Sequence, residues 1–130
     1  MKYLVTSFIL VAALGILFLG VSYAKNSEVV QEISVEEAMQ AWRKQEVVFV
    51  DVRTVEEYKQ GHVPGAVLLP LAELENRIDE VTKEKKVFII CRSGNRSGKA
   101  NIILQKNGFV NTYSVHGGML VWQEEIEKED

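Results

Sequence analysis

The chain has 130 residues, 15 of them basic and 18 acidic, which gives a formal net charge of −3. This length fits one domain with a core of its own and excludes two catalytic domains. A net acidic chain without a basic run argues against general nucleic-acid binding. Its single cysteine excludes an internal disulfide and any metal cluster held by several cysteines.

The first 24 residues have the pattern of an export leader. Lys2 lies in a short, positively charged start, and an unbroken apolar stretch follows from Phe8 to Val21. The small residues of Ser22-Tyr23-Ala24 then offer a cleavage site. These are the three parts of a secretory signal peptide, so we expect residues 1–24 to be removed.

An uncleaved membrane anchor is the alternative for this segment. Counted from Leu4, the apolar run is just long enough to span a bilayer. A membrane contact is expected only in that case. Both interpretations place residues 25–130 outside the cytoplasm, as one exported domain in the periplasm or another extracytoplasmic space.

Residues 25–130 alternate short apolar strands with amphipathic helices. The predicted strands cover residues 28–33, 47–50, 66–69, 86–90 and 109–115. Two predicted helices begin after Ser34 and Thr54, each of which starts a capping box with a glutamate three residues later. Further helices are predicted over residues 71–81, from the loop after residue 91 to Asn107, and over residues 119–127. This alternation predicts an α/β fold with a mainly parallel central sheet and helices on both faces.

Three segments with reactive or charged side chains follow predicted strands. They are Asp51-Val52-Arg53, Cys91 to Ser97, and His116-Gly117-Gly118. The carboxyl ends of parallel strands meet at one edge of a sheet, where the functional crevice of such folds lies. We therefore expect the three segments to lie together.

The segment from Cys91 to Ser97 joins a buried strand to a helix. A tight loop at this place points backbone N–H groups inward, and the helix adds its positive N-terminal end. Gly94 permits the turn, while Arg92 and Arg96 add positive charge. These features favour a thiolate and predict a nucleophilic Cys91 with a lowered pKa, although a lone cysteine after an apolar strand is often only a small core residue.

The predicted site is an anion-binding loop around this catalytic cysteine. Its expected binding residues are Arg92, Ser93, Gly94, Asn95, Arg96 and Ser97. Anion binding is favoured over simple solvent exposure for Arg96, and less strongly for Arg92.

Other polar and aromatic residues are expected to have structural roles. Arg53 either faces the crevice or pairs with Asp51 or a glutamate, and the structural pair is favoured, with Asp51 holding loop backbone. His62 and His116 lack the partners of a metal site, so no metal is expected. Of the aromatic residues, Trp42 and Trp122 are expected in the core.

The loop from Cys91 to Ser97 resembles the active-site loop of rhodanese-type sulfurtransferases. The similarity runs in consistent order from about Ile33 to Trp122. Besides the loop, it rests on Asp51-Val52-Arg53, Glu56, Glu57 and Tyr58, on Gly61-His62-Val63-Pro64-Gly65-Ala66 with Pro70, and on Gly117-Gly118 with Trp122. The resemblance implies a rhodanese-like fold over residues 25–130.

The resemblance also implies a mechanism. Cys91 would take the outer sulfur of thiosulfate or a persulfide donor, hold it as a persulfide, and pass it to cyanide or a thiol, without a cofactor. A carrier of sulfane sulfur with little steady-state turnover is the alternative, and a non-catalytic interaction module is disfavoured by the intact Cys91. Arg96 comes five positions after Cys91, whereas cysteine phosphatases use six and usually have a histidine where Ile90 stands. The loop therefore favours sulfur transfer over hydrolysis of phosphate esters.

Overall fold

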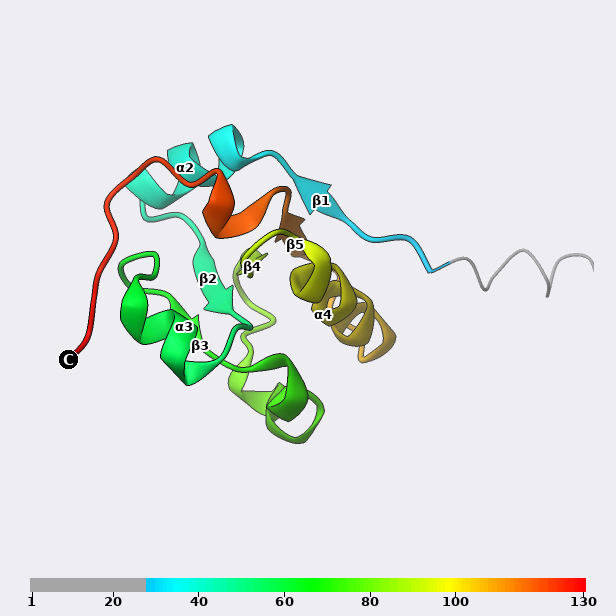
Figure 1. The fold of residues 1–130 in the computed structure, drawn as a ribbon. Helices are drawn as coiled ribbons and strands as arrows, with labels where there is room; N and C mark the ends of the chain where they lie inside the picture. The colour runs from blue at the N-terminus through cyan, green and yellow to red at the C-terminus, as the bar shows by residue number, and fades with distance from the viewer. Residues whose placement is uncertain (1–27) are drawn as a thin grey trace, which may run out of the picture.

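The computed structural model describes residues 28–130, so the predicted leader lies outside the described residues. The described chain forms a five-stranded, wholly parallel sheet in the order β1-β5-β4-β2-β3 (Figure 1). The strands are β1 (Glu32–Ile33), β2 (Val48–Asp51), β3 (Val67–Leu68), β4 (Val87–Ile90) and β5 (Thr112–Val115). No helix within residues 28–130 combines the length and the apolar character needed to cross a bilayer.

The central strand β4 explains why the sheet is buried on both faces. All four of its residues are buried. Val87 and Ile89 belong to one hydrophobic cluster, and Phe88 and Ile90 belong to the other. A continuous apolar run is what a parallel strand needs when helices cover both of its faces.

Helices lie on both faces of the sheet, which confirms the predicted fold class (Figure 1). One face is covered by α4 (Asn95–Lys106) and by the 3₁₀ segments η1 (Leu71–Glu73) and η2 (Glu75–Glu80). The other is covered by α2 (Val35–Arg43), by Tyr58 of α3 (Val55–Gln60) and by Trp122. The rings of Trp42 and Trp122 meet edge to face at 5.8 Å, which confirms both as packing residues.

Both predicted helix starts are present, with one difference between them. Thr54 and Glu57 form the complete reciprocal capping box of α3. At α2, Ser34 Oγ accepts from the Glu37 N–H at 3.2 Å, but the return bond from the Glu37 side chain is absent among the described contacts.

Two predicted helices are wrong. Residues 71–81 form η1 and η2, and Arg77 breaks the second with a φ of −124°. The helix predicted over residues 119–127 is only the 3₁₀ turn η3 (Gly118–Leu120). Beyond it, the backbone of Glu127 exchanges hydrogen bonds with that of His62 in an antiparallel bridge, so these bonds replace helical ones. The strands predicted over 28–33, 66–69 and 109–115 are also shorter than expected.

Asn101 of α4 ties the helix to the sheet. Its side chain is fully buried, accepts from the Gln31 N–H at 2.8 Å, and donates to the Thr112 carbonyl at 2.8 Å.

Asn101→Ala would leave the Gln31 N–H and the Thr112 carbonyl without this hydrogen-bond partner. We therefore expect a loss of about 1–3 kcal/mol in the free energy of unfolding, measured in urea. The exposed Asn76→Ala is the matched control and should change it by less than about 0.5 kcal/mol. Equal effects would show that the Asn101 bonds contribute nothing.

Candidate active site

The carboxyl edge of the sheet brings the predicted segments together. Cys91 directly follows β4, and its carbonyl accepts from the Met119 N–H at 2.9 Å. The Arg92 carbonyl accepts from the Leu120 N–H at 3.0 Å, and Val52 N–H donates to the carbonyl of Ile90 at 3.0 Å. The segments after β2, β4 and β5 are therefore neighbours, as the sequence predicts.

Gly118 permits this close approach. Its φ of +57° lies in the left-handed region, and an added Cβ would lie 2.3 Å from the Cys91 carbonyl oxygen. On the other side of the loop, Gly94 has a φ of +103° and begins α4. Two glycines thus shape the backbone that surrounds the cysteine.

Cys91 lies at the floor of the loop with 1% of its surface exposed. Its sulfur accepts from the Gly94 N–H at 3.1 Å and lies 3.5 Å from Ser97 Oγ. Burial raises the pKa of the thiol, but hydrogen bonds from the Ser97 hydroxyl and the N–H groups of Ser97, Gly94 and Ser93 outweigh it. The net pKa is lowered, in the direction that the sequence predicts.

The remaining loop residues divide into exposed and buried ones. Arg92, Ser93 and Asn95 are exposed, and Gly94 is partly buried. Ser97 is fully buried beside the thiol. Arg92 takes part in none of the ion pairs found among residues 28–130, so its expected contact with an anion stays a prediction.

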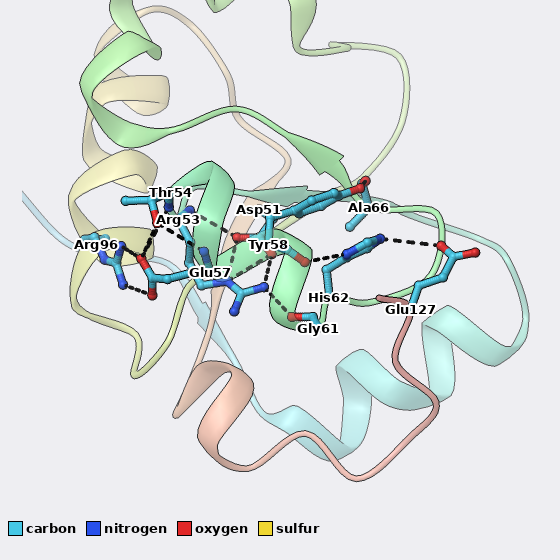
Figure 2. Close-up of polar contacts among 10 residues, drawn as sticks. All are labelled: Asp51, Arg53, Thr54, Glu57, Tyr58, Gly61, His62, Ala66, Arg96 and Glu127. Carbon is cyan, nitrogen blue, oxygen red and sulfur yellow. Dashed lines mark hydrogen bonds and ion pairs between the residues drawn. The ribbon is translucent and has the colours of Figure 1, made fainter. Parts of the chain in front are cut away.

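Arg96 has a partner that the sequence analysis did not identify. Its two terminal nitrogens bond both carboxylate oxygens of Glu57, at 2.6 and 2.8 Å (Figure 2). Chiefly through the hydrogen bond with Arg96, the pKa of Glu57 falls from 4.5 to about 2. The charge of Arg96 is therefore largely balanced, and its expected contact with an anion stays a prediction. In the sequence, Glu57 is marked by its capping position and by the family resemblance, and neither pattern pairs it with Arg96.

Asp51 and Arg53 form the structural pair that the sequence favours. Both side chains are buried, and the Arg53 guanidinium meets the carboxylate at 2.7 to 3.1 Å. Asp51 Oδ1 also accepts from the Arg53 backbone N–H at 3.0 Å, and Arg53 donates to the Gly61 carbonyl at 2.8 Å (Figure 2). The pair thus fastens the end of β2 to the end of α3.

His62 follows the end of α3 and packs against Tyr58 of that helix. It is buried, stacks on Tyr58 at 3.6 Å, and its Nδ1 lies 2.7 Å from the Tyr58 carbonyl oxygen (Figure 2). His116, by contrast, is exposed beside Glu32. Across residues 28–130, no three His, Cys, Asp or Glu side chains gather as a metal site would require.

Comparisons with known proteins identify the class. The family of the rhodanese-like domain matches residues 34–125, and the chain belongs to this family. It is 37% identical over 109 residues to the "Putative sulfur carrier protein YrkF" of Bacillus subtilis, covering 83% of this chain but only 59% of that protein. It is 37% identical over 78 residues to a sulfurtransferase of Allochromatium vinosum, covering 60% of this chain and 73% of that one.

A solved structure supports the same assignment. The rhodanese-like domain protein of Staphylococcus aureus superposes with a TM-score of 0.71 and 31% identity. The match covers 78% of this chain and the whole of that one. The fold around the cysteine loop is therefore that of a single rhodanese-like domain.

The Glu57–Arg96 pair makes the free energy of unfolding depend on pH. Because the pKa of Glu57 is depressed in the folded state, its stabilisation is present above pH 4.5 and is lost as the pH falls toward about 2. Glu57→Gln, which can still cap α3, should lower the free energy of unfolding by about 1–2 kcal/mol at pH 7, with the difference shrinking below pH 4.5.

The matched control is Glu73→Gln, which weakens an exposed pair with Arg77. Urea unfolding of both variants from pH 7 to pH 3 makes the comparison, with an expected effect of at most about 0.5 kcal/mol for Glu73→Gln. A Glu57→Gln difference that stays constant down to pH 3 would show that the carboxylate charge does not stabilise the loop.

Proposed function

We propose that the domain transfers sulfane sulfur through a persulfide on Cys91. The observation that carries this proposal is the placement of a single buried sulfur atom, which accepts from the Gly94 N–H at 3.1 Å and lies 3.5 Å from the Ser97 hydroxyl. Such donors stabilise a negative sulfur, whether it belongs to the thiolate or to a bound persulfide. The family and the sulfurtransferase relative support the same reaction class.

With thiosulfate as donor, the chemistry balances without a cofactor. The Cys91 thiolate attacks the outer sulfur, a new S–S bond forms, and the bond to the sulfonate sulfur breaks to release sulfite. A thiolate or cyanide then attacks the terminal sulfur and regenerates the Cys91 thiolate. The two half-reactions constitute covalent catalysis with ping-pong kinetics.

The burial of Cys91 supports sulfur transfer over hydrolysis of phosphate esters. With 1% of the residue exposed, the narrow loop favours a donor that presents a single sulfur atom. In a phosphate ester, the attacked phosphorus carries three oxygens besides the leaving group, so its binding requires a wider loop of hydrogen-bond donors. The short spacing from Cys91 to Arg96 supports the same choice.

A carrier role is the second candidate, favoured by the relative named as a sulfur carrier. A carrier loads the same Cys91 persulfide but delivers it to a protein and turns over slowly with small acceptors. Steady-state assay with thiosulfate and cyanide separates the two: turnover supports the enzyme, and loading with negligible turnover supports the carrier.

The proposed place of action is outside the cytoplasm, because residues 1–24 have the pattern of an export leader. Mass spectrometry of the chain recovered separately from the extracytoplasmic, membrane and cytoplasmic fractions tests this. A mature N-terminus at Lys25 supports cleavage, an intact chain in the membrane fraction supports the anchor, and an intact chain in the cytoplasm contradicts export.

Treatment with thiosulfate should add the mass of one sulfur atom to the chain. Because Cys91 is the only cysteine, intact-mass analysis reports on that residue alone. Cys91→Ser should gain no sulfur and lose essentially all transfer to cyanide, since a serine alkoxide is scarce at neutral pH. Asn76→Ala, an exposed residue of η2 outside the cysteine loop, is the control and should still load. Substantial transfer by folded Cys91→Ser would exclude the persulfide mechanism.

The domain should also discriminate between donors. We expect sulfur loading from thiosulfate and no measurable hydrolysis of an aryl phosphate by the same preparation. Phosphate release is the readout, and Cys91→Ser measures the background. Hydrolysis at a rate comparable to sulfur transfer would show that loop size and burial do not select the substrate.

A further inference from the structure

A second buried hydroxyl lies behind the cysteine loop. Ser114 of β5 is 1% exposed, and its Oγ lies 2.7 Å from Ser97 Oγ of α4. Ser97 Oγ in turn lies 3.5 Å from Cys91 Sγ and 3.2 Å from the Gly94 carbonyl oxygen. The three side chains form a connected row from the sheet to the reactive sulfur.

Counting protons shows what each hydroxyl can do. A serine hydroxyl donates one proton and accepts up to two. With a protonated thiol, Ser97 accepts from Cys91 and donates to the Gly94 carbonyl. With a thiolate, the proton of Ser97 must turn to the sulfur instead. Ser114 can donate to Ser97 in both states, and Ser97 is its only side-chain partner among the described hydrogen bonds.

We propose that Ser114 is a positioning residue that keeps the Ser97 hydroxyl as a donor to the Cys91 thiolate. A hydroxyl that accepts a hydrogen bond becomes a stronger donor, because the two bonds polarise one another. The bond from Ser114 also occupies a lone pair of Ser97, so that the Ser97 proton is directed toward the Gly94 carbonyl or the sulfur. Ser114 thereby acts on the nucleophile without touching it.

The charged groups near the loop would stay in place when Ser114 is replaced. They are Arg92 in the loop, Arg96 of α4 with its partner Glu57 of α3, the Asp51–Arg53 pair after β2, and the exposed His116 after β5 with its partner Glu32. None of these side chains bonds to Ser114. A change in the thiol titration would therefore report on the hydroxyl row.

The test is the pH titration of the Cys91 thiolate by its ultraviolet absorbance, in a chain with one cysteine. Ser97→Ala should raise the pKa by about one unit, the value of one hydrogen bond to a charged group. Ser114→Ala should raise it by about 0.3–0.5 unit, since a neighbouring bond changes donor strength by a fraction. Ser114→Thr, which keeps the hydroxyl, should restore the original value.

Thr112→Val is the matched control, because Thr112 is a buried hydroxyl two positions earlier on β5 that bonds Asn101 instead of the loop. It should destabilise the fold without changing the thiol pKa. In the double variant Ser97→Ala/Ser114→Ala, the shift should equal that of Ser97→Ala alone, because Ser114 acts through Ser97. Equal shifts for Ser114→Ala and Thr112→Val, or additive shifts in the double variant, would overturn the proposal.

The importance of Ser114 for catalysis rests on the proposed function, but the titration needs no sulfur transfer. A pKa shift in Ser114→Ala together with failure of the wild-type chain to load sulfur would overturn the proposed function and leave the role of Ser114 intact. Normal sulfur loading by the wild-type chain, together with an unchanged thiol pKa in Ser114→Ala, would support the proposed function and overturn the role of Ser114.

Discussion

The structure depends on placing many hydrogen-bond donors around one buried sulfur atom. A thiolate with 1% of its residue exposed has almost no water to stabilise it, so the loop must do so. Burial alone raises the pKa of Cys91, and only the combined hydrogen bonds of Ser97, Gly94 and Ser93 reverse the direction. The Ser97 hydroxyl and the N–H groups of the loop therefore set the direction of the thiol pKa, and none of the main causes of the shift is an arginine charge.

The rest of the fold holds that backbone in shape. The parallel sheet brings the ends of β2, β4 and β5 to one edge, and Gly118 lets the segment after β5 bond directly to the Cys91 carbonyl. From α3, the Glu57 carboxylate accepts hydrogen bonds from Arg96 in the first turn of α4 (Figure 2). The α3 helix that carries Glu57 is itself fastened by the bond from Arg53 to the Gly61 carbonyl. Backbone and side-chain hydrogen bonds from several elements thus hold the loop in place.

The sequence predicts features that depend on neighbouring residues, and it fails for contacts between residues that lie far apart in the chain. The buried run of β4, the capping box at Thr54 and the Asp51–Arg53 pair are readable, because each depends on neighbours in the chain. The bond between Arg96 and Glu57 joins residues 39 positions apart, which periodicity cannot reveal. The last helix was wrong because Glu127 bonds the backbone of His62. Three of the four residues of β5 carry a hydroxyl, so nothing in the sequence singles out Ser114.

The most direct test of this account is the pKa of the Cys91 thiol in the wild-type chain, compared with that of the same chain unfolded in urea. We expect a lower pKa in the folded protein, because the donors of the loop outweigh burial. A folded-state pKa equal to or above that of the unfolded chain would contradict it, since the loop would then not stabilise the thiolate on which sulfur transfer depends.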